Sequence, residues 1–262
     1  MKTSEEQRTF FDQHAPAIQK AAKAGGARQV IDFIDAFDDP LERRVLYLFA
    51  RHALFLDASY ARDLDVYIQV ANSGIDACLA QARAETDPED AKKRTDLANV
   101  ISYNLAADLA DSWGDDGLVR EERHFEVGHA AAERCVAWRE ELGKPPLPHS
   151  MAWWAKGMHE LSLGRADAAL ESFEKSADFG REASRKDGRA EDAVEASFAV
   201  LLARGYSAIA LASLGDADAE AVWTEVIDKF TQQLGDEATK KEAEFGMQQL
   251  RTVRERYWPD AS

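Results

Sequence analysis

The sequence predicts an all-α protein, and three observations support this fold class. Apolar residues recur at the three- and four-residue spacing of amphipathic helices, and no stretch shows a convincing strand-like alternation. The 7 prolines and 15 glycines are few, and they are expected between the periodic segments rather than inside them. Hydrophobic residues make up 45% and charged residues 31%, which is the balance of a folded globular chain.

The N-terminal part is expected to be a set of helix pairs. Residues 4–24 form an amphipathic pattern that ends at Gly25 and Gly26, and a short helix follows. Residues 45–56 are apolar nearly all round, which indicates a helix that packs on several sides at the centre of this part. Its partner helix is expected over about residues 60–84.

The middle of the chain is predicted to be a second pair. Asp87 caps a helix over about residues 88–113, because its side chain can accept from the first free backbone N–H groups. The segment 114–117 then turns the chain, and a helix returns over residues 119–142. The proline-dense segment 143–148 is expected to be a rigid joint outside the helices.

A helical hairpin is predicted around the turn at residues 163–165. Small, aromatic and apolar residues repeat at i, i+4 and i+8 on both sides of this turn, so each side has one packing face. The turn is too short for anything but an antiparallel return. The small members let the helices approach closely and the aromatic members fill the space beside them. The repeated residues are Trp153, Gly157 and Leu161 before the turn, and Ala169, Phe173 and Ala177 after it.

The C-terminal part is expected to continue this arrangement. A long helix is predicted over residues 191–214, and a turn at Gly215 leads to a partner helix that carries Trp223. The final amphipathic helix carries Ala243, Met247, Leu250 and Tyr257 on one stripe and is expected to cap the array.

This hairpin pattern resembles the tetratricopeptide repeat. Two weaker copies have their turns about 50 residues to either side, a spacing longer than the 34 residues of a standard repeat. The resemblance covers roughly residues 95–233. It implies an antiparallel helix-hairpin array, a tetratricopeptide-like α-solenoid over residues 91–262, with an N-terminal helical extension over residues 1–90. The residues that carry it are Trp153, Gly157, Gly164, Ala169 and Phe173.

In that family the first helix of each pair lines a concave groove that holds a peptide or a partner's helix. By register, the resemblance implies a groove with Asn and Asp at one end and Trp and Met at the other, which suits basic and apolar side chains. The alternative is structural, with Trp154 and Met158 packed on the preceding helix and the acidic residues at a solvated helix end beside Asp115 and Asp116. The implied partner-binding residues are Asn104, Asp108, Asp111, Trp154, Met158, Leu161 and Ile209.

A metal-dependent enzyme built in a helical bundle is the main alternative function, with its site near Asp108, Asp111 and His124. His124 and His129 are five residues apart on one helix, so they point about 140° apart and cannot share a metal. His52 is expected to be a hydrogen-bonded core residue. The sequence contains no phosphate-binding loop, nucleophile elbow or paired-cysteine motif, so we expect no cofactor and no catalytic residue.

The formal net charge of −16 argues against nucleic acid and anionic membranes as partners. No apolar run approaches the ~20 residues that span a bilayer, and the N-terminal residues lack the apolar core of a signal peptide. Cys78 and Cys135 are expected to be buried reduced thiols, as in the cytosol. The leading hypothesis is a cytoplasmic, non-catalytic protein- or peptide-binding scaffold. A regulator with an N-terminal DNA-binding unit ranks below it, because the first 60 residues lack a basic recognition helix.

Overall fold

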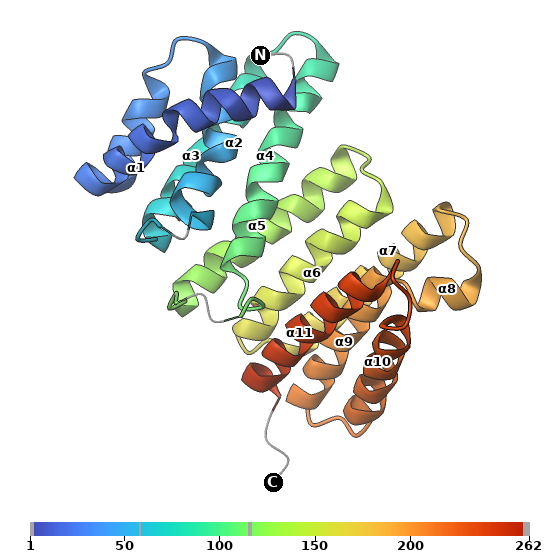
Figure 1. The fold of residues 1–262 in the computed structure, drawn as a ribbon. Coiled ribbons are helices and arrows are strands. Elements are labelled where there is room, and N and C mark those ends of the chain that lie inside the picture. The colour runs from blue at the N-terminus through green and yellow to red at the C-terminus, as the bar shows by residue number, and fades with distance from the viewer. Residues whose placement is uncertain (1–2, 58, 115–116, 259–262) are drawn as a thin grey trace. The chain divides into compact units, whose positions relative to one another are not determined.

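A computed structural model describes residues 3–57, 59–114 and 117–258. These residues form helices and connecting turns without a strand, as predicted, and successive helices pack against their neighbours as antiparallel hairpins (Figure 1). In chain order the elements are α1 (Ser4–Asp35), α2 (Pro40–Arg51), the π-helical turn η1 (His52–Leu56), α3 (Leu64–Ala84), α4 (Pro88–Leu109), α5 (Glu122–Glu141), α6 (Pro146–Ser162), α7 (Ala166–Lys186), α8 (Glu191–Glu195), α9 (Phe198–Ser213), α10 (Ala219–Gln233) and α11 (Lys240–Tyr257).

The chain divides into two compact units, Met1–Leu105 (unit 1) and Ala106–Ser262 (unit 2). The division falls late in α4, whereas the sequence placed the boundary at residue 90, near the start of this helix. Among the described residues, no helix is long and apolar enough to cross a membrane. Cys78 and Cys135 are buried and carry thiols rather than a disulfide, as expected.

The first helix of unit 1 is sharply kinked at the two glycines. Gly25 and Gly26 have non-helical backbone angles, and Gly26 takes a φ of 63°, which favours glycine. The chain reverses there, so that the rings of Phe10 and Phe37 lie 6.0 Å apart. The expected break is confirmed. The expectation that prolines stay outside helices is wrong for Pro16, which lies inside α1.

The second helix of unit 1 changes its winding near its end. Asp39 caps α2 by accepting a hydrogen bond from the backbone N–H of Leu41 at 2.8 Å. The helix continues only to Arg51 and then widens into η1, where the N–H of Asp57 donates to the carbonyl of His52 at 3.1 Å. Because a π-turn holds more residues than an α-turn, it rotates the following side chains relative to the register of α2.

The hairpin predicted in unit 2 is formed by α6 and α7. Gly164 closes the turn with a φ of 71°, and the two helices approach at Gly157, where an added Cβ would lie 2.6 Å from Cε1 of Phe173. Phe173 is fully buried at this contact. Trp153 does not fill the space beside this helix contact, contrary to expectation. It is half-buried, and the ammonium of Lys175 lies 4.4 Å from its ring centroid.

Two segments of unit 2 differ from the sequence prediction. Pro146 begins α6, so half of the expected proline-rich joint is the first helical turn, where a proline costs no hydrogen bond. The single helix predicted over 191–214 is interrupted at Ala196 and Ser197, which separates the short α8 from α9.

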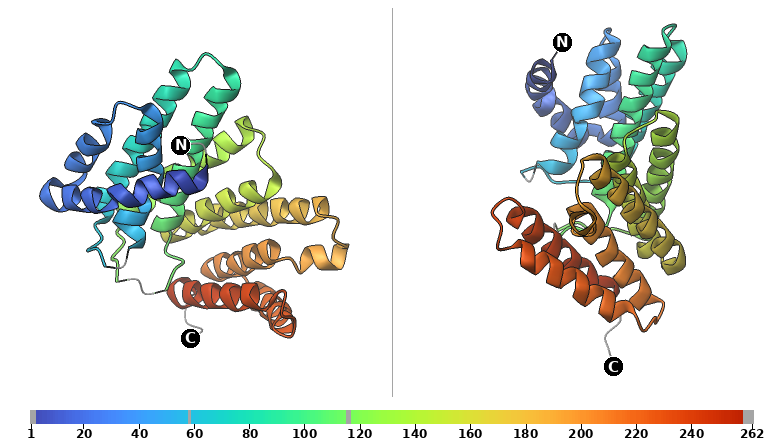
Figure 2. Two further views of the ribbon diagram at one scale, coloured as in Figure 1. Left: turned by 45° about the horizontal axis from the view of Figure 1, so that its top comes forward. Right: turned by 90° about the vertical axis from the view of Figure 1, so that its right-hand side faces the viewer.

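The centre of unit 2 is α9. It packs against α7, α10 and α11, and Val200, Leu201 and Tyr206 on it are completely buried. The helices α10 and α11 also pack against each other, and Figure 2 shows this orange-to-red end of unit 2 in two further views. The last helix therefore completes the core of unit 2 and leaves its other side exposed.

Candidate functional site

In unit 2, aromatic side chains of α6, α9 and α11 and of the segment after α4 contact one another in a strip. We define this aromatic strip as Trp113, Trp154, Phe198 and Phe245. The ring centroid of Trp113 lies 6.2 Å from that of Trp154 and 6.4 Å from that of Phe245, and Phe198 lies 6.3 Å from Phe245. Aromatic pairs at these separations attract one another.

Exposure differs among the four members of the strip. Trp154 is only 8% exposed and lies beside the buried Tyr206, whereas Phe245 is 46% exposed. Trp113 and Phe198 are intermediate. The indole N–H of Trp113 donates to the carbonyl of Ala107 at 2.8 Å, which fixes the orientation of this ring. The strip thus has one buried member, Trp154, and one member with a largely exposed ring, Phe245.

Asp111, one of the expected groove residues, is bound by the last helix. Arg256 donates to Oδ1 of Asp111 at 2.7 Å, and the hydroxyl of Tyr257 donates to Oδ2 at 2.9 Å. The Tyr257 hydroxyl is also 2.9 Å from Oγ of Ser162, at the end of α6. Both carboxylate oxygens are therefore occupied, and Asp111 fastens α11 to the segment after α4 instead of facing a groove.

The structure separates the remaining predicted partner-binding residues. Asn104 is half-buried and belongs to unit 1, whereas the others belong to unit 2. Met158 and Ile209 are completely buried, and Leu161 and Asp108 are nearly so. These four are packing residues in this conformation, because their neighbours cover the surface that a partner would contact. Of the implied groove residues in unit 2, Trp154 alone joins a surface with exposed members.

The residues of the metal alternative are used in other ways. Nδ1 of His124 accepts a hydrogen bond from the backbone N–H of Glu121 at 3.0 Å, which caps α5. Both carboxylate oxygens of Asp111 accept from α11, as described above. In the described part of the chain, no group of three His, Cys, Asp or Glu side chains is arranged to hold a metal ion. The geometry therefore does not assemble Asp108, Asp111 and His124 into a site.

A buried charged cluster on α5, α6 and α7 was not predicted as a unit. Lys156 donates to Oε1 of Glu160, and the hydroxyl of Ser172 donates to Oε2 at 2.6 Å. Nε2 of His129 lies 3.4 Å from the same carboxylate. The spacing of Lys156 and Glu160, four residues apart on one helix, was the only sequence signal for it.

The hydrogen bonds of this cluster keep its acid ionised. Burial alone would raise the pKa of Glu160, but hydrogen bonds from His129, Lys156 and Ser172 lower it below its ordinary value. Because the Lys156 ammonium is paired with this carboxylate and the Ser172 hydroxyl donates to it, neither group is activated as a nucleophile. The cluster satisfies buried charges and joins three helices.

Comparison with protein-family models, with curated proteins and with solved structures found no match.

Proposed function

We propose that this protein is a non-catalytic scaffold that binds a peptide or protein segment through the aromatic strip of unit 2. The proposal includes degenerate tetratricopeptide-like repeats as the basis of the hairpins and a cytoplasmic location. The observation that carries it is the contact of three partly exposed aromatic rings, Trp113 after α4, Phe198 on α9 and Phe245 on α11. Aromatic residues supply most of the energy at protein interfaces because each buries a large apolar area with few rotatable bonds.

The expected partner carries basic and apolar side chains. An apolar or aromatic side chain would pack on Phe245, which leaves nearly half of its surface exposed. The formal net charge of −16 attracts cationic segments and raises the rate at which they encounter the protein. The same charge argues against nucleic acid as a partner.

The metal-dependent enzyme is the second candidate, and the structure offers it less support. Its proposed ligands Asp111 and His124 already serve as a helix anchor and a helix cap. In the aromatic strip, by contrast, nearly half of the surface of Phe245 is exposed and open to a partner. We therefore favour binding over catalysis.

The test uses peptides selected from a random displayed library against the immobilised full-length protein. Selected peptides are synthesised, and their Kd is measured for the unmodified protein, for Phe245→Ala and for Leu214→Ala. Leu214 is a matched control, because it is 40% exposed and lies near the opposite end of α9 from Phe198, about 24 Å away at 1.5 Å per residue.

The proposal predicts peptides enriched in Lys, Arg and aromatic residues. It predicts that Phe245→Ala raises Kd about tenfold or more, as for a central aromatic contact, while Leu214→Ala changes it less than about twofold. Failure to enrich any peptide, or equal effects of the two substitutions, contradicts the proposal.

A further inference from the structure

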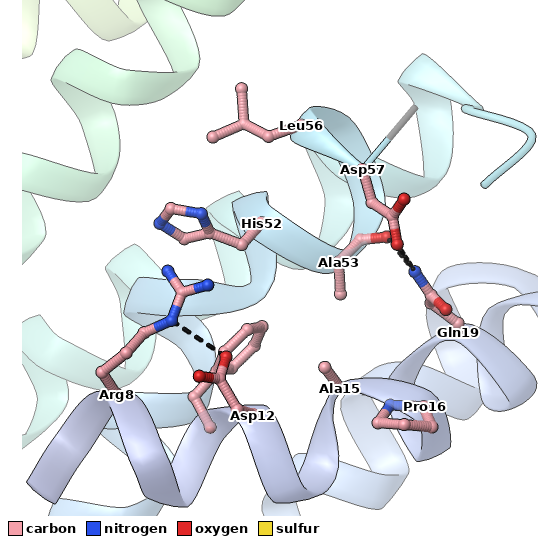
Figure 3. Close-up of a pocket in the computed structure, with 10 residues that line it drawn as sticks. Arg8, Asp12, Ala15, Pro16, Gln19, His52, Ala53, Leu56 and Asp57 are labelled. Carbon is pink, nitrogen blue, oxygen red and sulfur yellow. Dashed lines mark hydrogen bonds and ion pairs between the residues drawn. The ribbon is translucent and has the colours of Figure 1, made fainter. Parts of the chain in front are cut away.

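An open depression of about 400 Å³ lies in unit 1 between α1 and the π-helical turn η1 (Figure 3). It is separate from the aromatic strip, which belongs to unit 2. Its wall combines charged, polar and apolar side chains from two elements that are far apart in the sequence. The lining residues that the argument uses are Arg8, Asp12, Pro16, His52, Leu56 and Asp57.

Arg8 is oriented for binding by three groups of its own unit. Its Nε donates to Oδ1 of Asp12 at 2.9 Å, and its guanidinium carbon lies 5.8 Å and 5.9 Å from the ring centroids of Phe11 and Phe49. Within the described residues, no hydrogen bond engages its two terminal amino groups. Figure 3 shows these groups on the side of the guanidinium that faces His52. A planar guanidinium held in this way presents a fork that matches a carboxylate or phosphate.

His52 stands beside this fork at the start of η1. Its ring lies 5.7 Å from Phe49, and in the part of the chain that the structure describes no hydrogen bond engages its nitrogens. The expectation of a hydrogen-bonded core histidine is therefore wrong, because the side chain is half-exposed at the depression. Burial, followed by the nearby charges of Arg8 and Arg51, lowers the pKa of His52, whereas Asp12 raises it. The two arginines thus favour the neutral ring, and Asp12 favours the protonated one.

The rest of the wall disfavours a multiply charged anion and favours a ligand that carries an apolar group. Asp12 and Asp57 add negative charge, and hydrogen bonds from Ser59 and Gln19 lower the pKa of Asp57, so it is ionised at neutral pH. A doubly charged phosphate is disfavoured beside these acids, whereas a singly charged carboxylate meets less repulsion. Leu56 is 44% exposed, and with Pro16 it provides an apolar surface next to the fork.

We propose that this depression binds a carboxylate joined to an apolar body, with the terminal amino groups of Arg8 and the ring of His52 on the carboxylate and Leu56 against the body. The source is either a free apolar acid or the C-terminus of a peptide. π-Helical turns occur disproportionately at functional sites, and this one places His52 and Leu56 on the same depression. The site is independent of the peptide binding proposed for unit 2.

The probes are N-acetyl-leucine, its uncharged amide, and a short acetylated peptide that ends in leucine with a free or an amidated C-terminus. Binding is followed by NMR from the ring protons of His52, which the variant His52→Gln identifies. The proposal predicts saturable shifts and a rise in the pKa of His52 with the two acids, and neither effect with the two amides. Comparing the two acids shows which source binds more tightly.

The matched control for Arg8 is Arg28, which forms the same i,i+4 pair on α1, with Asp32 at 2.9 Å, but is 83% exposed and lies outside the depression. Arg8→Gln should weaken binding of the acids about tenfold or more, the effect of losing charge-assisted hydrogen bonds, and Arg28→Gln should not. Because Arg8→Gln also removes contacts with two phenylalanines, Leu56→Ser supplies a second variant that should weaken binding without unfolding.

Three results would overturn the inference. The first is equal binding of acids and amides, and the second is equal weakening by Arg8→Gln and Arg28→Gln. The third is tighter binding of inorganic phosphate than of either acid, which would indicate a general anion site.

Discussion

The hydroxyl of Tyr257 donates a hydrogen bond to Asp111 at 2.9 Å across 146 residues of sequence. With Arg256, which donates to the other carboxylate oxygen, it fastens the end of α11 to the segment that follows α4. The last turn of a helix tends to fray unless it is held. This contact therefore holds the last turn of α11, and the apolar face of the helix packs against α9.

Removing this anchor should loosen the last turn of α11. Asp111→Ala removes the carboxylate that accepts from Arg256 and Tyr257, and leaves them only the backbone carbonyl of residue 111 and the hydroxyl of Ser162. We expect a loss of about 1–3 kcal/mol in the free energy of unfolding. Tyr257→Phe removes only the hydroxyl and should cost about 0.5–1.5 kcal/mol. Urea unfolding measures both losses, and amide exchange along α11 localises them. Unchanged exchange in α11 of Asp111→Ala would show that the anchor is not what holds the helix.

The contact between α6 and α7 should not accept a side chain at Gly157. Gly157→Leu forces the new side chain into Phe173, where even a Cβ would lie 2.6 Å from the ring, so we expect a cost of about 1–3 kcal/mol or more. Gly235→Leu is the control, because the nearest atom to its Cβ is a backbone oxygen at 3.6 Å. Thermal and urea unfolding of the two variants test the difference, and equal stability would mean that the helices separate easily.

Stability should fall as the pH drops from about 6.5 to about 4. The pKa of His159 is lowered from 6.5 to about 4, chiefly by burial and also by nearby His129 and Arg120, against opposing effects of the Ala106 carbonyl and Glu160. The unfolded chain therefore binds a proton in this range that the folded chain excludes, which stabilises the unfolded state. The loss from this residue is on the order of 2–4 kcal/mol, at about 1.4 kcal/mol per pKa unit.

Urea unfolding at several pH values between 7 and 4 measures this slope. His159→Gln retains a donor for the Ala106 carbonyl, which accepts from Nε2 of His159 at 2.9 Å, but it cannot be protonated. The variant should lose stability less steeply over the same range. A slope as steep as that of the unmodified protein would assign the acid sensitivity to other groups.

The pair Lys156 and Glu160 should show strong coupling. Lys156→Met leaves a buried carboxylate with only Ser172 and His129 as partners, and we expect a cost of about 3 kcal/mol. Adding Glu160→Gln removes the uncompensated charge and should recover part of that loss. A double-mutant cycle measured by urea unfolding gives the coupling energy. Additive effects of the two substitutions would show that the pair does not interact in the folded state.

The hairpins were predictable because their signals are local. The turn at Gly164 follows from a glycine between two periodic segments, and the structure confirms it with a positive φ. The spacing of Trp153 and Gly157 was also clear, but periodicity alone does not say how far around a helix the packed face extends. Trp153 therefore appeared to be a core residue, although it lies half-buried beneath Lys175.

The residues of the candidate sites were harder to predict, because contacts distant in sequence decide them. The register of α4 predicts a groove position for Asp111, whereas its carboxylate accepts hydrogen bonds from Arg256 and Tyr257, which lie far away in the sequence. Met158 and Ile209 occupy groove positions by register, yet α6 and α9 are covered on several sides and bury them completely. His52 was assigned to the core from α-helical periodicity, which the π-turn interrupts at that residue.

The measurement that tests the aromatic strip most directly is NMR mapping with a peptide selected against the protein. The proposed function predicts that the indole N–H resonance of Trp113 and the ring resonances of Phe245 and Phe198 shift on saturation. The methyl resonances of Leu214 should not shift. Shifts confined to other surfaces of unit 2, with the Trp113 and Phe245 resonances unchanged, would contradict it.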